Sequence, residues 1–303
     1  MTEPKQPKAE ANRISHMLRI VLGEDRFPVQ AGEVAMEYSR QCFGDSPVDK
    51  VQGDDLNGCE GMLAANKARS RWLILYNSAV RSEGRKSFTI AHEFGHYILH
   101  RHERDQFNCG NDDIETGDGN ERDIESEADT FASTLLMPLD DFRRQVDGQP
   151  VSFDLLGHCA DRYGVSLTAA ALRWTEIADQ RAVLVASRDD HMLWAKSNEA
   201  AYKSGAVFAT RKRTIAIPAD ALAHSNNGVQ TSQSHCTRAQ VWFPRESASV
   251  ELTEMTKVAG NYDYTLTLLL MPDAQWRQPQ HDDEEPQEDT FDRFVNNGQA
   301  PDR

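Results

Sequence analysis

The segment FTIAHEFGHYILHRH, residues 88–102, combines four histidines and one glutamate with apolar residues at helical spacing, so we expect a helix. Positions i and i+4 of a helix lie one turn apart on the same side, and His92 and His96 can therefore aim two imidazoles at one point. Neutral imidazole is a good zinc ligand, and Glu93 can take the proton of a water that the metal activates. This HExxH spacing predicts a zinc site in which Glu93 is the catalytic base.

The segment itself offers two candidates for a third metal ligand. His102 stands at the spacing that metzincins use, but Leu99 occupies the position of the glycine that turns the chain back in those enzymes. His100 continues the row of histidines, but an undistorted helix places it about 6 Å further along the axis from His96. Both candidates therefore lie away from the point at which His92 and His96 meet.

A later stretch, ERDIESEADTFASTLLMP at residues 121–138, offers a carboxylate ligand instead. Glu125 and Asp129 share one face of the predicted helix with three apolar residues, Ala128, Ala132 and Leu136. A carboxylate on an inward face needs compensation, and metal ligation supplies it. We therefore favour Glu125 as the third ligand and expect Asp129 to orient a ligating histidine through its outer N–H. Glu127, expected on the other side of this helix, is the alternative.

The composition of the chain limits the class of protein. The 303 residues suffice for two domains, and the net charge of −15 argues against non-specific coating of nucleic acid. No run approaches the roughly 18 apolar residues that span a bilayer, and the N-terminal residues lack the apolar core and cleavage site of a signal peptide. Five scattered cysteines, none in a CxxC pair, favour free thiols over a disulfide framework. We expect a cytoplasmic protein without a membrane partner.

The order of the remaining patterns indicates a mixed fold. RWLILYNS, residues 71–78, is typical of a strand, and residues 102–123 are typical of a long loop. Residues 151–178 predict two helices around a YGVS turn. From about residue 181, short strand-like runs follow, among them TIAIP and AQVWF. The acidic, Pro/Gln-rich residues 279–303 predict a disordered tail.

Two stretches together carry a resemblance to a known family. RKSFTIAHEFGHYILH at residues 85–100 matches the pattern FTxAHExGHxxLH, and ESEADTFASTLLMP at residues 125–138 matches ExEAxxFAxxLLMP. Asp129 stands where Asn is common in that second pattern. Over roughly residues 25–178 the sequence thus resembles the ImmA/IrrE family of zinc metallo-endopeptidases.

This resemblance implies an α+β protein with a mainly helical, zincin-like metallopeptidase domain that contains a small sheet. It implies Zn²⁺ as the cofactor and a helix-turn-helix transcriptional repressor as the substrate, cleaved to switch on a stress, DNA-damage or phage-defence response. In radiation-response members a GAF-like sensor domain follows. We divide the chain into a flexible N-terminus with a first helix (1–24), the metallopeptidase domain (25–150), a helix-turn-helix-like helical pair (151–180), a β-rich GAF-like sensor domain (181–278) and the tail (279–303). The alternative is a metal-bound, non-proteolytic or antitoxin-like module that sequesters a DNA-binding partner.

Regulation and substrate binding add three further hypotheses. Cys109 lies in the expected loop between the two ligand-bearing helices, and its thiolate could occupy the open metal position and inhibit the enzyme. The basic run of Arg211, Lys212 and Arg213 is a candidate site for an activator, either single-stranded DNA or a small molecule. The strand at residues 71–78 could serve as the sheet edge to which an extended substrate segment adds.

Overall fold

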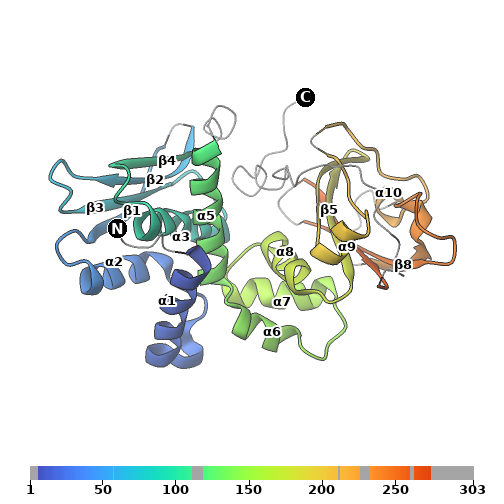
Figure 1. Ribbon diagram of the computed structural model, residues 1–303, viewed down its shortest axis with the longest axis horizontal. Coiled ribbons are helices and arrows are strands. Elements are labelled where there is room, and N and C mark those ends of the chain that lie inside the picture. The colour runs from blue at the N-terminus through green and yellow to red at the C-terminus, as the bar shows by residue number, and fades with distance from the viewer. Residues whose placement is uncertain are drawn as a thin grey trace. The chain divides into compact units, whose positions relative to one another are not determined.

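The computed structural model describes residues 6–56, 58–110, 119–210, 212–225, 233–259 and 263–273. The chain divides into two compact units, one of Met1–Asp147 with Cys159–Ser166 and one of Gly148–His158 with Leu167–Arg303 (Figure 1). The expected five-part division stays a prediction, and the expected tail, residues 279–303, lies outside the described residues. Within the described ranges, no helix is both long and apolar enough to cross a bilayer.

The first unit combines helices with a small mixed sheet. Its elements up to residue 147 are α1 (Pro7–Leu22), η1 (Gly23–Arg26), α2 (Ala31–Cys42), β1 (Val48–Asp54), β2 (Cys59–Ala65), β3 (Trp72–Asn77), α3 (Glu83–Leu99), β4 (Gln106–Gly110), α5 (Gly119–Leu136) and α6 (Leu139–Val146). The strand order is β1-β3-β2-β4, with β1 parallel to β3 and the other neighbours antiparallel. Helix α3 packs against β2, β3 and α5 (Figure 1).

Two expectations about this sheet are wrong. The strand within residues 71–78 is β3, which lies between β1 and β2 and is therefore not an edge. Trp72 and Ile74 of β3 are buried, as the apolar run of an interior strand requires. The strand at the edge beside α3 is β4, which forms within residues 102–123, where we expected a loop. Its sequence, QFNCG, has one large apolar residue, too few for a periodic pattern.

Helix α3 is fixed at both ends and along one side. Ser82 caps its start, accepting a hydrogen bond from the backbone N–H of Arg85 at 3.3 Å. At its end the buried Arg101 guanidinium donates to the carbonyls of Tyr97 and Ile98 at 3.0 and 3.2 Å, which suits the negative end of the helix dipole. A Cβ on Gly95 would lie 3.2 Å from the backbone of Ala128, so this glycine lets α3 and α5 approach closely.

The second unit contains a five-stranded antiparallel sheet in the order β6-β5-β9-β8-β7. Its strands are β5 (Arg181–Arg188), β6 (His191–Ser197), β7 (Gln233–Arg238), β8 (Glu251–Val258) and β9 (Thr265–Met271). The helices are α7 (Phe153–Tyr163), which crosses the division of the chain, α8 (Leu167–Ile177), α9 (Glu199–Lys203), α10 (Leu222–Ser225) and the 3₁₀ helix η2 (Ala239–Val241). The buried side chains of β5 and β9 make the centre of the sheet apolar.

Two of the expected strands in this unit are wrong. TIAIP contributes only an isolated bridge between Ala216 and His191. AQVWF turns through η2 instead, and the buried Trp242 that follows donates its indole N–H to the Glu254 carboxylate, 3.0 Å away. The polar strand β7 has no apolar alternation and was not predicted.

Candidate metal centre

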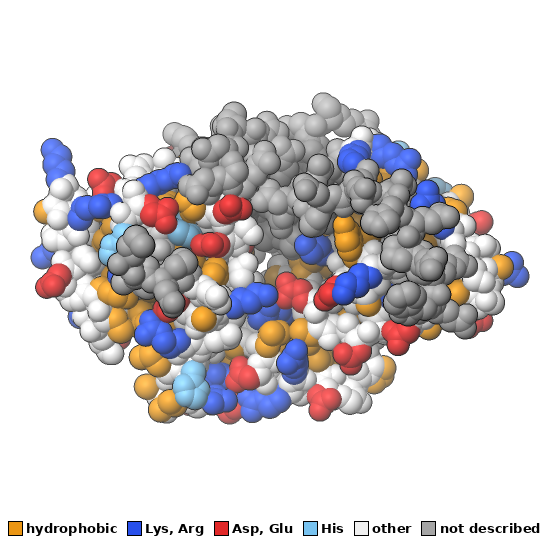
Figure 2. Space-filling model, in the orientation of Figure 1, with side chains coloured by type: hydrophobic (Ala, Val, Ile, Leu, Met, Phe, Trp, Pro, Cys, Tyr) orange, Lys and Arg blue, Asp and Glu red, His pale blue; other side chains and the backbone are white. Residues whose placement is uncertain are grey.

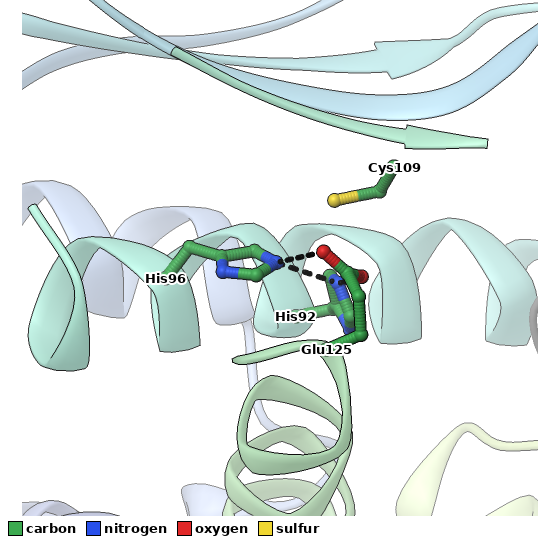
Figure 3. A group of neighbouring side chains, drawn as sticks. All are labelled: His92, His96, Cys109 and Glu125. Carbon is green, nitrogen blue, oxygen red and sulfur yellow. Dashed lines mark hydrogen bonds and ion pairs between the residues drawn. The ribbon is translucent and has the colours of Figure 1, made fainter. Parts of the chain in front are cut away.

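Three donor groups converge where α3 meets α5. The Nε2 atoms of His92 and His96 lie 3.0 Å apart. The Glu125 carboxylate of α5 places Oε2 at 3.1 Å from Nε2 of His92 and Oε1 at 3.3 Å from Nε2 of His96. Figure 3 shows the carboxylate lying against both rings. The structure therefore brings together the two histidines and the glutamate that we favoured as metal ligands.

The spacing of these donors fits a zinc ion. Tetrahedral zinc with bonds of about 2.0–2.1 Å to nitrogen and oxygen separates its ligand atoms by about 3.3 Å. The observed separations are 3.0, 3.1 and 3.3 Å, so small adjustments would accommodate the ion. Two imidazoles and a carboxylate are also a donor set that suits zinc. His92, His96 and Glu125 could thus hold zinc through Nε2, Nε2 and the carboxylate.

A fourth donor approaches the group from the sheet. The Sγ atom of Cys109 on β4 and the donor atoms of His92, His96 and Glu125 all lie within 4.8 Å of one another. Figure 3 shows this thiol pointing from the strand toward the other three residues. Burial raises the pKa of Cys109 well above its ordinary value, and the negative charges of Glu93 and Glu125 raise it further. A cation among the donors would favour the thiolate instead.

Glu93 lies fully buried beneath β2. A Cβ on Gly61 of that strand would come within 2.4 Å of Glu93 Oε1, so the carboxylate occupies the space that the glycine leaves. Neither carboxylate oxygen has a hydrogen-bond partner of ordinary geometry among the described residues. Burial raises the pKa of Glu93 to about 8, although the charge of His92 opposes the shift. A pKa near neutrality suits a group that takes up a proton and returns it.

The outer nitrogen of His92 and the ring face of His96 also contact neighbouring side chains. Asp129 Oδ1 lies 2.8 Å from Nδ1 of His92, the contact expected from its position on α5. Burial alone would lower the pKa of His92, but the hydrogen bonds with Asp129 and Glu125 raise it well above its ordinary value. Burial lowers the pKa of His96 to about 4. The ring of Phe107 stacks on that of His96 with centroids 4.7 Å apart, which restrains the imidazole.

The alternative third ligands lie elsewhere. His102 is exposed beyond the end of α3. His100 is buried, but its Nε2 faces Glu127 Oε2 at 2.9 Å and its Nδ1 faces Nδ1 of His96 at 3.2 Å. The expectation that Glu127 points away from the histidines is therefore wrong, because its long side chain reaches back to α3.

Two residues that shape this centre were not predicted. Gly61 and Phe107 lie on neighbouring strands of the sheet, and each contacts a residue of α3. A single glycine or phenylalanine outside a periodic run does not indicate, from the local sequence, that it lies near a metal centre. Only the pairing of β2 with β4 over α3 brings these residues to the centre.

The basic run lies in the second unit. Lys212 and Arg213 are exposed, between α9 and α10, and Arg211 lies outside the described residues. The role of this run in binding an activator therefore stays a prediction.

Comparison with known families identifies the region around the donors. The sequence model of the IrrE N-terminal-like domain, peptidase M78, matches residues 50–175. This range contains α3, β4 and α5, and with them every donor of the centre. Comparison with curated proteins gives no match.

Proposed function

We propose, from the premise that residues 50–175 are a metallopeptidase domain of the ImmA/IrrE (peptidase M78) family, that this protein is a zinc-dependent endopeptidase acting in the cytoplasm. Its substrate is a helix-turn-helix transcriptional repressor, cleaved at one exposed site to switch on a stress, DNA-damage or phage-defence response. Family membership implies a protein substrate. The kind of protein rests on the resemblance of the two helical stretches to regulatory members of the family.

One observation carries the enzymatic part of the proposal, namely the buried Glu93 carboxylate next to the converging donors of His92, His96 and Glu125. Zinc, when bound there, supplies Lewis acidity that acidifies a water and polarises a peptide carbonyl. Glu93 takes a proton from the attacking water and passes it to the nitrogen of the leaving amine. Asp129 holds the His92 ring by its Nδ1 proton, so that Nε2 keeps its lone pair for the metal.

Substrate binding is proposed along β4 rather than along β3. The edge strands of the described sheet are β1 and β4, and β4 is the one that carries Phe107 and Cys109 toward α3. An extended segment of the target adds to this edge through backbone hydrogen bonds. A regular helix cannot pair in this way, so the cut falls in a linker or loop of the repressor. Separating its DNA-binding part from its dimerisation part removes the joint reading of two half-sites, and transcription rises.

Cys109 is proposed as an inhibitory fourth ligand. Its position on the edge strand, with Sγ within 4.8 Å of the other donor atoms, supports this role. A thiolate bound there excludes the attacking water and keeps the enzyme inactive until β4 or its side chain moves.

The second unit is proposed to be a GAF-like sensor. Its five-stranded antiparallel sheet is compatible with this assignment. The activator is single-stranded DNA or a small molecule, and Arg211, Lys212 and Arg213 are the proposed contacts. Figure 2 shows acidic and basic side chains interspersed over the described part of the face that it displays. Because the net charge is −15, nucleic-acid binding through this run would be local and salt-sensitive.

The alternative function is sequestration of the partner without cleavage. The buried Glu93 favours the enzyme, because a binder needs no base beside the metal. The test mixes the metal-loaded protein and a single-stranded oligonucleotide with candidate helix-turn-helix repressors, first any encoded by a neighbouring gene, and maps fragments by mass. We expect two discrete fragments with the wild type and none with Glu93→Gln, which retains zinc. Broad digestion of unrelated unfolded proteins, or an intact but bound repressor, would contradict the proposal.

A further inference from the structure

A third histidine caps the end of α3, one helical turn beyond the two metal donors, and α5 carries three carboxylates that face these histidines. The histidines are His92 and His96 on α3 and His100 at its C-cap, and the carboxylates are Glu125, Glu127 and Asp129 on α5. Glu125 faces the Nε2 atoms of the two donors, and Asp129 faces the outer nitrogen of His92. His100 and Glu127 remain without a role in the proposed reaction.

These two residues continue outward from His96. Nδ1 of His96 lies 3.2 Å from Nδ1 of His100, and Nε2 of His100 lies 2.9 Å from Glu127 Oε2. We call His96, His100 and Glu127 the histidine triad.

The proton positions in the histidine triad follow from Glu127 at its outer end and from the metal at its inner end. If Nε2 of His96 keeps its lone pair for zinc, the proton of that ring is on Nδ1 and is donated to His100. Nδ1 of His100 then accepts, so the proton of His100 is on Nε2. The Glu127 carboxylate accepts a hydrogen bond from that N–H, which completes one consistent set of neutral imidazole tautomers. A second proton on His100 would place two N–H groups against each other.

Burial makes these contacts important for His96. His96 is fully buried and His100 is 3% exposed, so neither ring has water as an alternative partner. Phe107 stacks on His96, and its ring centroid lies 6.2 Å from that of His100. The Glu127 side chain, in contrast, is 46% exposed, so the outer end of the histidine triad lies at the surface.

We propose that His100 is a positioning residue for the metal centre. It holds the His96 ring in the tautomer and orientation that direct the Nε2 lone pair at zinc, and Glu127 fixes His100 in turn. The inference rests on the proposed zinc site and deepens it. His92 is oriented by a carboxylate and His96 by an imidazole, and the two donors therefore lie in different electrostatic surroundings.

Matched substitutions distinguish this positioning role from a packing role in which His100 only fills space in the core. His100→Leu fills similar volume without an acceptor for Nδ1–H of His96. His100→Asn places Oδ1 close to the position of Nδ1 and keeps an acceptor. Glu127→Ala removes the acceptor for His100 at a half-exposed position, so it tests the histidine triad even if a change at His100 impairs folding. His102→Leu removes an exposed histidine just beyond α3 and is the control.

The experiment measures the zinc dissociation constant by competition with a fluorescent chelator, alongside the Tm of each metal-free protein. No substrate is used, so failure of the endopeptidase proposal would not affect the readout. We expect His100→Leu to weaken zinc binding about 10–100-fold, the range for partners of metal-bound histidines, and Glu127→Ala about 10-fold. His100→Asn should recover most of the affinity, and His102→Leu should match the wild type. Wild-type affinity in both His100→Leu and Glu127→Ala would overturn the proposal. So would equal weakening by His100→Leu and His100→Asn, because the acceptor would then be irrelevant.

Discussion

Gly61→Ala should separate the proposed base from the proposed metal ligands. The new Cβ would stand 2.4 Å from Glu93 Oε1 and 2.6 Å from Thr89 Cγ2. Ordinary contact begins at 3.4 Å, so the carboxylate must move by about 1 Å (3.4 − 2.4). A displacement of about 1 Å in catalytic geometry costs roughly 100-fold in rate. Overpacking of this kind costs about 1–3 kcal/mol in stability, or roughly 2–12 °C in Tm.

The assay combines repressor cleavage under single-turnover conditions with zinc content and thermal unfolding. Zinc should remain bound, because the atoms nearest to the new Cβ belong to Glu93 and Thr89 and not to the donors. Gly157→Ala is the control, since nothing lies within 4 Å of the Cβ that it adds to α7. Cleavage at the wild-type rate by Gly61→Ala would refute the placement of Glu93 as the base. Loss of zinc would show that the substitution acts through the ligands instead.

Three further outcomes are expected. Glu125→Ala should lose zinc while His102→Ala retains it, as metal analysis of the purified proteins can show; the reverse would refute the ligand assignment. Cys109→Ser should raise cleavage in the absence of activator, and an unchanged basal rate would remove the inhibitory role. Asp141→Asn should lower the free energy of unfolding by about 1.5–3 kcal/mol at neutral pH, because the buried carboxylate accepts a hydrogen bond from Arg162 Nε at 2.8 Å. Burial opposes ionisation of Asp141, but the hydrogen bonds from Arg162 and Tyr163 lower its pKa. The stabilisation is thus present above about pH 4 and lost as pH falls further. The denaturation curves of the two proteins should therefore converge in acid.

Helix periodicity made part of the centre predictable from the sequence. His92 and His96 are one turn apart in a single helix, so their convergence is a local property. Glu125 and Asp129 could be placed because a carboxylate on an apolar helix face needs a compensating partner. These four residues meet as expected.

The sheet could not be predicted, because its strand order is not a local property. RWLILYNS is typical of a strand, but nothing in it distinguishes an interior strand from an edge. The short strand β4 forms because it pairs with β2, and this pairing brings Phe107 onto His96 and Cys109 to the donors. The reach of Glu127 to His100 likewise depends on how closely α5 approaches α3, which Gly95 permits.

The close contact of α3 with α5 also makes the metal part of the fold. Two donors belong to one helix and the third to the other, so zinc bound at this centre cross-links segments that are separate in the chain. A ligand that binds only the folded state adds about 4 kcal/mol when its free concentration is about a thousand times its Kd. Under zinc starvation that contribution disappears, and a larger fraction of the protein opens and becomes available to cellular proteases. With zinc as the bound metal, its supply would therefore affect the amount of the protein in the cell as well as its activity.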